Sequence, residues 1–265
     1  MMLQLNKIYN MDCFEFLEKI DNGIIDLAVL DPPYNMNKAD WDTFESQKVF
    51  FDFTYKWIDA VIPKLKDTGS IYIFNTPFNS AYILQYLVNR GLIFRNWITW
   101  DKRDGFSTTT KKYVTGQETI LFFTKSEEHT FNYDQIRVPY ESEDRINHAK
   151  IKGILKNGER WYPNPNGRLC GDVWHITSER LKNKVNGRTP KLQHPTSKPL
   201  ELIERIINAS SNEGDLVLDC FMGSGTTAIA CKETGRNFIG CDKNKSYVNL
   251  ARKALREMEK QQKLI

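Results

Sequence analysis

Apolar and polar positions in the first half of the chain predict strands that alternate with helices. Residues 49–65 and 79–89 repeat their apolar side chains at helical spacing, and we interpret the aromatic residues of the first segment as core packing. Short apolar runs of strand length lie at 26–30, 69–74, 93–100 and 119–124. Such alternation is typical of an α/β protein with a mainly parallel sheet.

The regular pattern stops after the fourth strand and returns late in the chain. Turn dipeptides such as Asn157-Gly158 interrupt the sequence between these points. Later elements are predicted as a helix that begins near Pro199, strands at 216–219 and 237–241, a helix at 226–233 and a charged terminal helix at 243–265. We therefore divide the chain into a catalytic part at 1–124, an insertion at 125–190 and a cofactor-binding part of the same domain at 191–265.

The composition indicates a soluble domain without a membrane span, a disulfide framework or a metal site. No apolar run in the 265 residues approaches the ~20 residues that a membrane span needs, and the first ten residues lack a secretory signal. Five cysteines are scattered without a CxxC pair, and four histidines show no ligand spacing. We expect a reduced, cytoplasmic protein.

Basic residues concentrate in the predicted insertion. The net charge is only +4, but the segment from Lys150 to Lys191 holds ten Lys or Arg and three acidic residues. Its surplus therefore exceeds that of the whole chain. Two interpretations remain open, a solvated loop-rich surface and a face that contacts phosphates.

The motif Asp31-Pro32-Pro33-Tyr34 carries the chemistry of the predicted site. It follows a buried strand and so lies at the carboxyl edge of the sheet, where α/β proteins build their sites. An exocyclic amine is a poor nucleophile because its lone pair is delocalised into the ring. The Asp31 carboxylate and the Pro32 carbonyl can accept both N–H groups and free this lone pair. Tyr34 can stack on a base rotated out of the duplex, or face a sulfonium cation. We predict that Asp31, Pro32, Pro33 and Tyr34 are catalytic.

A glycine-rich turn, Phe221-Met222-Gly223-Ser224-Gly225-Thr226, joins a predicted strand to a predicted helix. Its glycines let the backbone approach a ligand, and the helix start offers unpaired N–H groups. Asp242 ends the next strand, where the ribose hydroxyls of a nucleoside cofactor would bind. Asp219 could pair with the ammonium of an amino-acid cofactor. The turn alone does not separate NAD from S-adenosylmethionine.

Taken together, these motifs resemble those of DNA amino-methyltransferases in the beta arrangement. In that family a DPPY motif precedes a target-recognition region, which precedes an FxGxGT cofactor loop. The likeness spans nearly the whole chain and includes the segment His194-Pro195-Thr196-Ser197-Lys198-Pro199, which matches the family's HPTxKP. The resemblance implies that S-adenosylmethionine is the cofactor, that Lys198 lies near its methionine part and that Asp12 lies near its adenine.

The resemblance also implies the fold and the biology. The fold would be Rossmann-like, with a seven-stranded, mostly parallel sheet that is circularly permuted so that the cofactor-binding strands come last. Type IIS modification enzymes are the most similar group, which implies adenine N6 methylation of double-stranded DNA by base flipping within a restriction-modification system. A cognate endonuclease as functional partner, a homodimer and a prokaryotic, nucleoid-associated location follow as further expectations.

Several alternatives were weighed against this interpretation. Cytosine C5 methylation is excluded because no cysteine follows a proline. Cytosine N4 methylation uses the same lone-pair chemistry, and only the family association of Asp31 with adenine argues against it. Protein-glutamine enzymes place the cofactor loop before the proline motif. RNA methylation stays open, as does a silent nucleic-acid-binding module. An NAD-dependent oxidoreductase would leave the DPPY motif unexplained.

Candidate DNA contacts lie in two regions. Four basic residues flank a Gly/Ser/Thr-rich loop that either closes over DNA or is merely exposed: Lys102, Arg103, Lys111 and Lys112. Four others lie among the aromatic residues of the insertion: Arg160, Arg168, Arg180 and Lys184.

Overall fold

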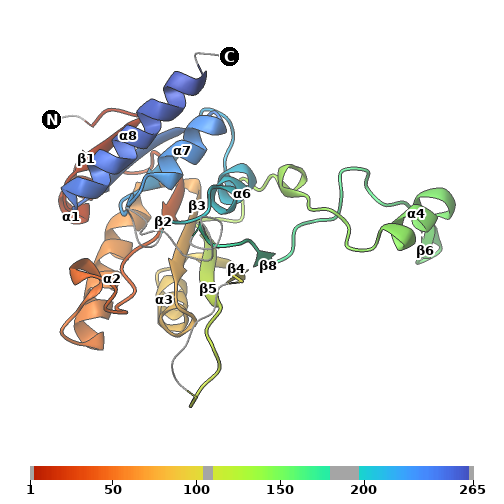
Figure 1. The fold of residues 1–265 in the computed structure, drawn as a ribbon, viewed down its shortest axis with the longest axis horizontal. Helices are drawn as coiled ribbons and strands as arrows, with labels where there is room; N and C mark the ends of the chain where they lie inside the picture. The colour runs from red at the N-terminus through yellow and green to blue at the C-terminus, as the bar shows by residue number, and fades with distance from the viewer. Residues whose placement is uncertain (1–2, 104–109, 180–196, 263–265) are drawn as a thin grey trace, which may run out of the picture.

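The computed structural model describes residues 3–103, 110–179 and 197–262, which build one large sheet with helices on both faces (Figure 1). Its eight strands are, in spatial order, β1 (Lys7–Asn10), β10 (Asn237–Asp242), β9 (Leu216–Asp219), β2 (Ile25–Leu30), β3 (Leu65–Asn75), β5 (Gln117–Thr124), β4 (Ile93–Asp101) and β8 (Val173–His175). Within this sheet only β5 runs antiparallel to its neighbours. The prediction of an α/β fold with a mostly parallel sheet is confirmed.

The expected number of strands was one too low. The first seven strands in the spatial order form a mostly parallel sheet with one reversed strand, as the resemblance implied. β8 is the eighth, and it pairs with β4 through Thr99 and Val173. It has only three residues and lies within the predicted insertion, so no apolar alternation marks it in the sequence.

Alternating side chains of the strands divide the interior into two cores. Leu27 and Val29 of β2 face one side, whereas Ala28 and Leu30 face the other. The first core is covered by α6 (Leu200–Ser210), α7 (Thr226–Glu233) and α8 (Lys245–Gln262). The second is covered by α1 (Cys13–Glu18), α2 (Gln47–Val61) and α3 (Pro77–Asn89). Burial on both faces explains why the strands read as continuous apolar runs.

Local signals fix where these helices begin and end. Ser46 caps α2 by accepting the N–H of Val49 at 3.2 Å. Thr76 caps α3, and Pro77 occupies its first turn. The predicted helix 49–65 ends earlier, at Val61, because Pro63 lies in a 3₁₀ turn and offers no N–H. Among the described helices, none is long and apolar enough to cross a membrane.

The residues between η3 (Tyr133–Ile136) and β8 form an arm that extends away from the sheet (Figure 1). Its far end holds α4 (Glu143–Lys152) and a hairpin of β6 (Ile154–Lys156) and β7 (Glu159–Trp161). Asn157 and Gly158 both have positive φ in the hairpin turn, as the dipeptide predicts. Two segments of the arm pair through Val138 and Arg168, whose N–H groups each donate to the other's carbonyl.

Candidate active site

Three acidic residues meet at the carboxyl edge of the sheet. Asp31 follows β2, Asp219 ends β9 and Asp242 ends β10. These strands are parallel neighbours, so their ends converge at one edge. A cavity of about 690 Å³ opens there. It is lined by the DPPY motif, the loop 38–44, the glycine-rich turn, Lys198 and the start of α8.

Asp42 holds the backbone that follows the DPPY motif. Its carboxylate is buried and accepts the N–H groups of Tyr34 and Asn35 at 2.6 and 2.9 Å. It also accepts those of Met36 and Lys38 at 3.1 and 3.2 Å. One carboxylate that collects four backbone donors fixes the loop by charge-assisted hydrogen bonds. The motif is therefore presented on a rigid turn.

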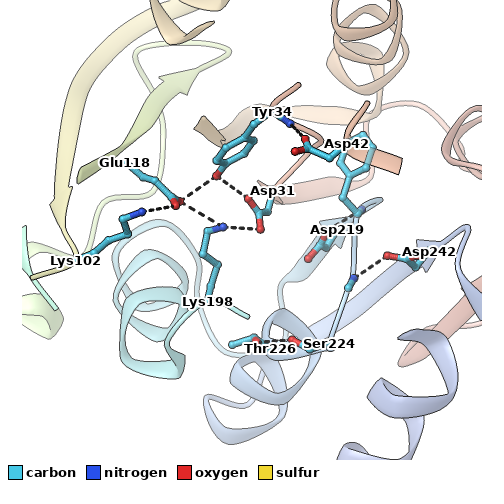
Figure 2. A network of polar contacts seen from close by, with 12 residues as sticks. Asp31, Tyr34, Asp42, Lys102, Glu118, Lys198, Asp219, Ser224, Thr226 and Asp242 are labelled. Atoms are coloured by element: carbon cyan, nitrogen blue, oxygen red, sulfur yellow. Dashed lines mark hydrogen bonds and ion pairs between the residues drawn. The ribbon is translucent and has the colours of Figure 1, made fainter. Parts of the chain in front are cut away.

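A buried polar network surrounds Asp31 (Figure 2). The Lys198 ammonium donates to Asp31 Oδ2 at 2.6 Å, and the Tyr34 hydroxyl donates to Asp31 Oδ1 at 2.8 Å. Glu118, at the start of β5, accepts the same Tyr34 hydroxyl at 3.1 Å. Glu118 also lies 3.5 Å from Lys198 and 3.1 Å from Lys102. Two carboxylates and two ammonium groups thus balance one another inside the protein.

The network sets the protonation states of its members. Burial would raise the pKa of Glu118, but the ammonium groups of Lys198, Lys102 and Lys38 outweigh burial and lower this pKa to about 2. Burial would lower the pKa of Lys198, yet the carboxylates of Asp31 and Glu118 outweigh it and raise this pKa. Burial and both carboxylates raise the pKa of Tyr34. At neutral pH the Glu118 carboxylate and the Lys198 ammonium are therefore charged, and the Tyr34 phenol is neutral.

The glycine-rich turn is shaped partly by packing against α8. Gly225 has φ of +87°, and a Cβ built there would lie 2.7 Å from the Cβ of Ala251. Because Gly225 has no side chain, it can adopt the positive φ of the turn and also lets α8 pack closely against it. The N–H of Gly223 donates to Asp242 at 2.9 Å, and the Ser224 and Thr226 hydroxyls lie 3.3 Å apart.

The two acids at the ends of β9 and β10 are buried and bound by backbone. Asp219 accepts the N–H of Phe221 at 2.9 Å, and burial raises its pKa to about 7. Asp242 accepts from Gly223 and from Asn244, the latter at 2.7 Å. Burial raises the pKa of Asp242 as well. Each carboxylate is thus oriented by the turn next to it.

A family model described as DNA methylase, for N6 and N4 methyltransferases, matches residues 25–253. The chain belongs to this DNA methylase family. The Type II methyltransferase M1.MboII of Moraxella bovis is 66% identical over 258 residues, 97% of this chain and 99% of that protein. A structure of the M1.HpyAVI–SAM complex is 27% identical with a TM-score of 0.60, covering 94% of this chain and 98% of that one. The cytosine-N4-specific PvuII methyltransferase shares the fold, with a TM-score of 0.67 at 19% identity over 94% and 86% of the two chains.

Membership of the family confirms the prediction of an enzyme that methylates DNA with S-adenosylmethionine, and it excludes the NAD-dependent oxidoreductase. The cavity of the methyltransferase fits this cofactor. Its volume of about 690 Å³ lies within the usual range for small-molecule sites. The buried Asp219 would be stabilised in its charged form by an ammonium, and each oxygen of Asp242 keeps capacity for a hydroxyl. Phe221 adds an aromatic wall.

The structure brings most of the predicted site residues to this one cavity. Those that line it are Asp12, Asp31, Pro32, Pro33, Tyr34, Lys198, Asp219, Phe221, Gly223, Ser224, Thr226 and Asp242. Gly225 lies in the same turn but packs against α8. Asp12 also caps α1 through the N–H of Phe14. The roles assigned to these residues stay predictions.

The predicted DNA contacts are spread more widely. Arg103, Lys111 and Lys112 are exposed beside the loop, whereas the Lys102 ammonium points to Glu118. In the arm, Arg160 donates to the carbonyl of Lys152, and Arg168 pairs with Glu141. Arg180 and Lys184 lie outside the described residues. DNA contact by all eight stays a prediction.

Several residues of the site escaped the sequence analysis. Glu118 and Asp42 are acids in the network and the loop, and Lys38, Trp41 and Tyr247 line the cavity. The Trp41 indole N–H donates to the Tyr247 hydroxyl at 3.3 Å. A charged residue directly before the predicted strand 119–124, which has an apolar centre, was the one available signal for Glu118.

Proposed function

We propose that this methyltransferase methylates N6 of adenine at a specific site in double-stranded DNA, as the modification enzyme of a type II restriction-modification system. The observation that carries the proposal is the position of the Asp31 carboxylate. It lies in the cavity between the Tyr34 hydroxyl and the acids of the cofactor turn, with 25% of its side chain exposed. The type II methyltransferase name of the relative M1.MboII supports the biological role.

Asp31 and Pro32 act on the target amine. The Asp31 carboxylate and the Pro32 carbonyl accept its two N–H groups, which draws the nitrogen toward a tetrahedral geometry and frees its lone pair. Tyr34 supports the base, which must leave the duplex to reach the cavity. When the nitrogen gains its methyl group it becomes cationic and loses one proton. Asp31 is placed to receive this proton and pass it to solvent.

The cofactor is bound by residues at the ends of β9 and β10. When bound, S-adenosylmethionine supplies a methyl group on a sulfonium, so that the S–C bond breaks as the N–C bond forms and a neutral thioether leaves. Asp219 binds the ammonium of the amino-acid part, and Lys198 lies near that part. Asp242 binds the ribose hydroxyls, and Asp12 lies near the adenine.

The assignments of adenine as the target base and of the beta arrangement rest on the sequence motifs. In the resembling family an aspartate at the first motif position goes with adenine and a serine with cytosine, so Asp31 favours adenine. The order of DPPY motif, arm and cofactor turn supports the beta arrangement, with 125–190 as the target-recognition insertion between the parts 1–124 and 191–265. An asymmetric target of the type IIS kind is part of the same proposal.

The arm and the exposed basic residues Arg103, Lys111 and Lys112 meet the DNA. The arm combines Arg160 with the exposed rings of Trp161 and Tyr162, a composition that suits phosphate and base contacts. A cognate endonuclease acts on the same sequence without having to bind this enzyme. A homodimer and a location on the nucleoid complete the proposal.

Transfer of labelled methyl from S-adenosylmethionine to duplex DNA, followed by nucleoside analysis of the digest, tests the function. We expect N6-methyladenine, and sequencing of the modified DNA should return one short asymmetric site. N4-methylcytosine would overturn the base assignment, and label confined to RNA would overturn the substrate. Asp31→Asn keeps the shape of the side chain and should abolish transfer. Asp52→Asn, an exposed carboxylate on α2, is the matched control and should retain full activity.

A further inference from the structure

Both oxygens of the Asp31 carboxylate already have partners. Lys198 Nζ lies 2.6 Å from Oδ2, and the Tyr34 hydroxyl lies 2.8 Å from Oδ1. A target amine that donates to Asp31 must share these oxygens or replace a partner. Lys198 is the stronger obstacle, because its ammonium is the cationic donor and makes the shorter contact.

Lys198 cannot simply move into water. Its side chain is only 7% exposed, so an ammonium that left Asp31 without a new partner would stay buried, unpaired and poorly solvated. The ammonium therefore needs a second acceptor within reach if it is to release Asp31. A small rotation of the Lys198 side chain toward such an acceptor is then the least costly way to release Asp31.

Glu118 provides that second acceptor. Its Oε2 lies 3.5 Å from Lys198 Nζ and 3.1 Å from the Tyr34 hydroxyl, so both partners of Asp31 already touch it (Figure 2). Its other oxygen is held by Lys102 at 3.1 Å, which fixes the carboxylate in place. Glu118 is itself only 8% exposed and stands on β5, the reversed strand.

We propose that Glu118 is a positioning residue that takes over Lys198 and the Tyr34 hydroxyl when the target amine binds to Asp31. The inference rests on the proposed function, because it requires an amine at Asp31. The exchange is a movement of hydrogen bonds, in which no covalent bond changes and the network keeps its net charge. Without Glu118, Lys198 stays on Asp31 and competes with the amine.

A purely structural role for Glu118 gives different expectations. A scaffold residue would lower activity whether or not Lys198 is present, and its loss would not alter how the rate depends on pH. The exchange requires Glu118 and Lys198 to act as one unit, so their effects should not add. It also makes the rate sensitive to the charge of Lys198 once Glu118 is gone.

Single-turnover methyl transfer at saturating cofactor and DNA tests the exchange in Glu118→Gln, Lys198→Met and the double variant. Glu118→Gln should lower the rate roughly 10- to 100-fold, the range that a misplaced reacting group costs. The same change made in the Lys198→Met protein should cost less than about 3-fold, because the competitor is absent. Equal losses in the two backgrounds would overturn the proposal, as would an unchanged rate in Glu118→Gln.

The pH dependence gives a second, independent readout. Loss of the Glu118 carboxylate lowers the pKa of Lys198, so the lysine begins to lose its proton as pH rises and then frees Asp31. The rate of Glu118→Gln should therefore rise from neutral to alkaline pH relative to the unmodified enzyme, whereas Glu118→Gln in the Lys198→Met protein should show no such rise. A parallel pH profile in all three proteins would contradict the exchange.

Two controls keep the outcomes distinct. Glu127→Gln makes the same chemical change at an exposed glutamate just beyond β5 and should leave rate and pH profile unchanged. If Glu118→Gln fails to fold by circular dichroism, Glu118→Asp keeps the charge but withdraws it from Lys198, and it should show a smaller loss with a smaller rise at high pH. A flat profile there would overturn the proposal. Failure of the proposed function itself would appear in the unmodified enzyme, as absence of a methylated base amine.

Discussion

The ammonium of Lys198 lies 2.6 Å from the carboxylate of Asp31, although 167 residues separate them in sequence. The contact joins the loop after β2 to the start of α6, and so links the first part of the domain to the last. The whole chain must fold before the site exists, since neither residue is near the other in any local element. The position of Asp31 is thus tied to the last part of the domain through one lysine.

Replacement of Asp31 by alanine should abolish methyl transfer while cofactor binding persists. If the carboxylate accepts the target amine as proposed, its loss should lower the single-turnover rate roughly 1,000-fold, as for removal of a key polar group at a reacting centre. Isothermal titration with S-adenosylhomocysteine should give a dissociation constant within about 3-fold of the unmodified enzyme. A parallel loss of affinity and rate would mean that Asp31 acts on the cofactor instead.

Replacement of Asp42 by alanine should destabilise the loop that follows the DPPY motif. Four backbone N–H groups lose their acceptor at once, and the loss is most expensive at Tyr34, whose hydrogen bond is buried while the other three are partly buried. We expect a decrease of about 2 to 4 kcal/mol in the free energy of unfolding, measured by urea denaturation. Asp40→Ala, an exposed acid two residues away, is the matched control and should stay within about 0.5 kcal/mol. Similar losses in the two variants would refute the role of Asp42.

Much of this architecture follows from local pattern. The strands around Leu27 and Ile71 are buried on both faces and therefore read as apolar runs, and the DPPY and glycine turns lie at their predicted strand ends. β1 and β8 could not be predicted, because each is short, lacks the run of three aliphatic residues that marks β9 and pairs with a strand distant in sequence.

The candidate site likewise contains residues that could be predicted from the sequence and residues that could not. Asp31, Asp219 and Asp242 could be predicted because each ends or follows a strand, and strand order brings them together. Glu118 could not, because its proximity to Asp31 depends on β5 running antiparallel beside β3. The orientation of Lys102 could not be predicted from the sequence either. Its neighbours in sequence suggested a surface loop, whereas the structure turns its ammonium inward to Glu118.

Cofactor affinity should depend on pH through Asp219. Its pKa is raised by burial to about 7, so in the free protein it is largely protonated below pH 7 and charged above. The proposed pairing of Asp219 with the cofactor ammonium requires the charged form, so the dissociation constant should increase as pH falls, by up to about tenfold per unit. Above about pH 8 the α-amino group of the cofactor itself loses its proton, and affinity should fall again.

Titration calorimetry from pH 5 to 9 measures this window. Asp219→Asn should bind more weakly at pH 7.5 and should lose the dependence on the acid side, because no carboxylate remains to be ionised. Asp215→Asn, an acid just before β9 at the opposite end of the strand, is the control and should keep the dependence. An unmodified enzyme with equal affinity at pH 5.5 and 7.5 would rule out an Asp219–ammonium pair.

Replacement of Gly225 by alanine should weaken the packing of the cofactor turn on α8. The new methyl group would lie 2.7 Å from Ala251 Cβ, and the φ of +87° is strained for any residue with a side chain. We expect a loss of about 1 to 3 kcal/mol in the free energy of unfolding and a lower affinity for the cofactor. Ala251→Gly in the same protein should restore part of the stability, because it removes the 2.7 Å contact with Ala251 Cβ, whereas the 3.1 Å contact with Ala251 Cα and the backbone strain remain. No recovery in the double variant would show that the clash is unimportant.

The basic residues beside the Gly/Ser/Thr-rich loop should separate into two functions. Arg103, Lys111 and Lys112 are exposed, and if they contact phosphates, their joint replacement by alanine should reduce the salt slope of DNA binding by roughly 0.9 for each contact. Lys102→Ala should leave that slope unchanged, because its ammonium is bound to Glu118, but should lower the rate of methyl transfer. Fluorescence anisotropy from 50 to 300 mM salt measures the slope. An equal change of slope on loss of Lys102 alone would place this lysine on the DNA backbone instead.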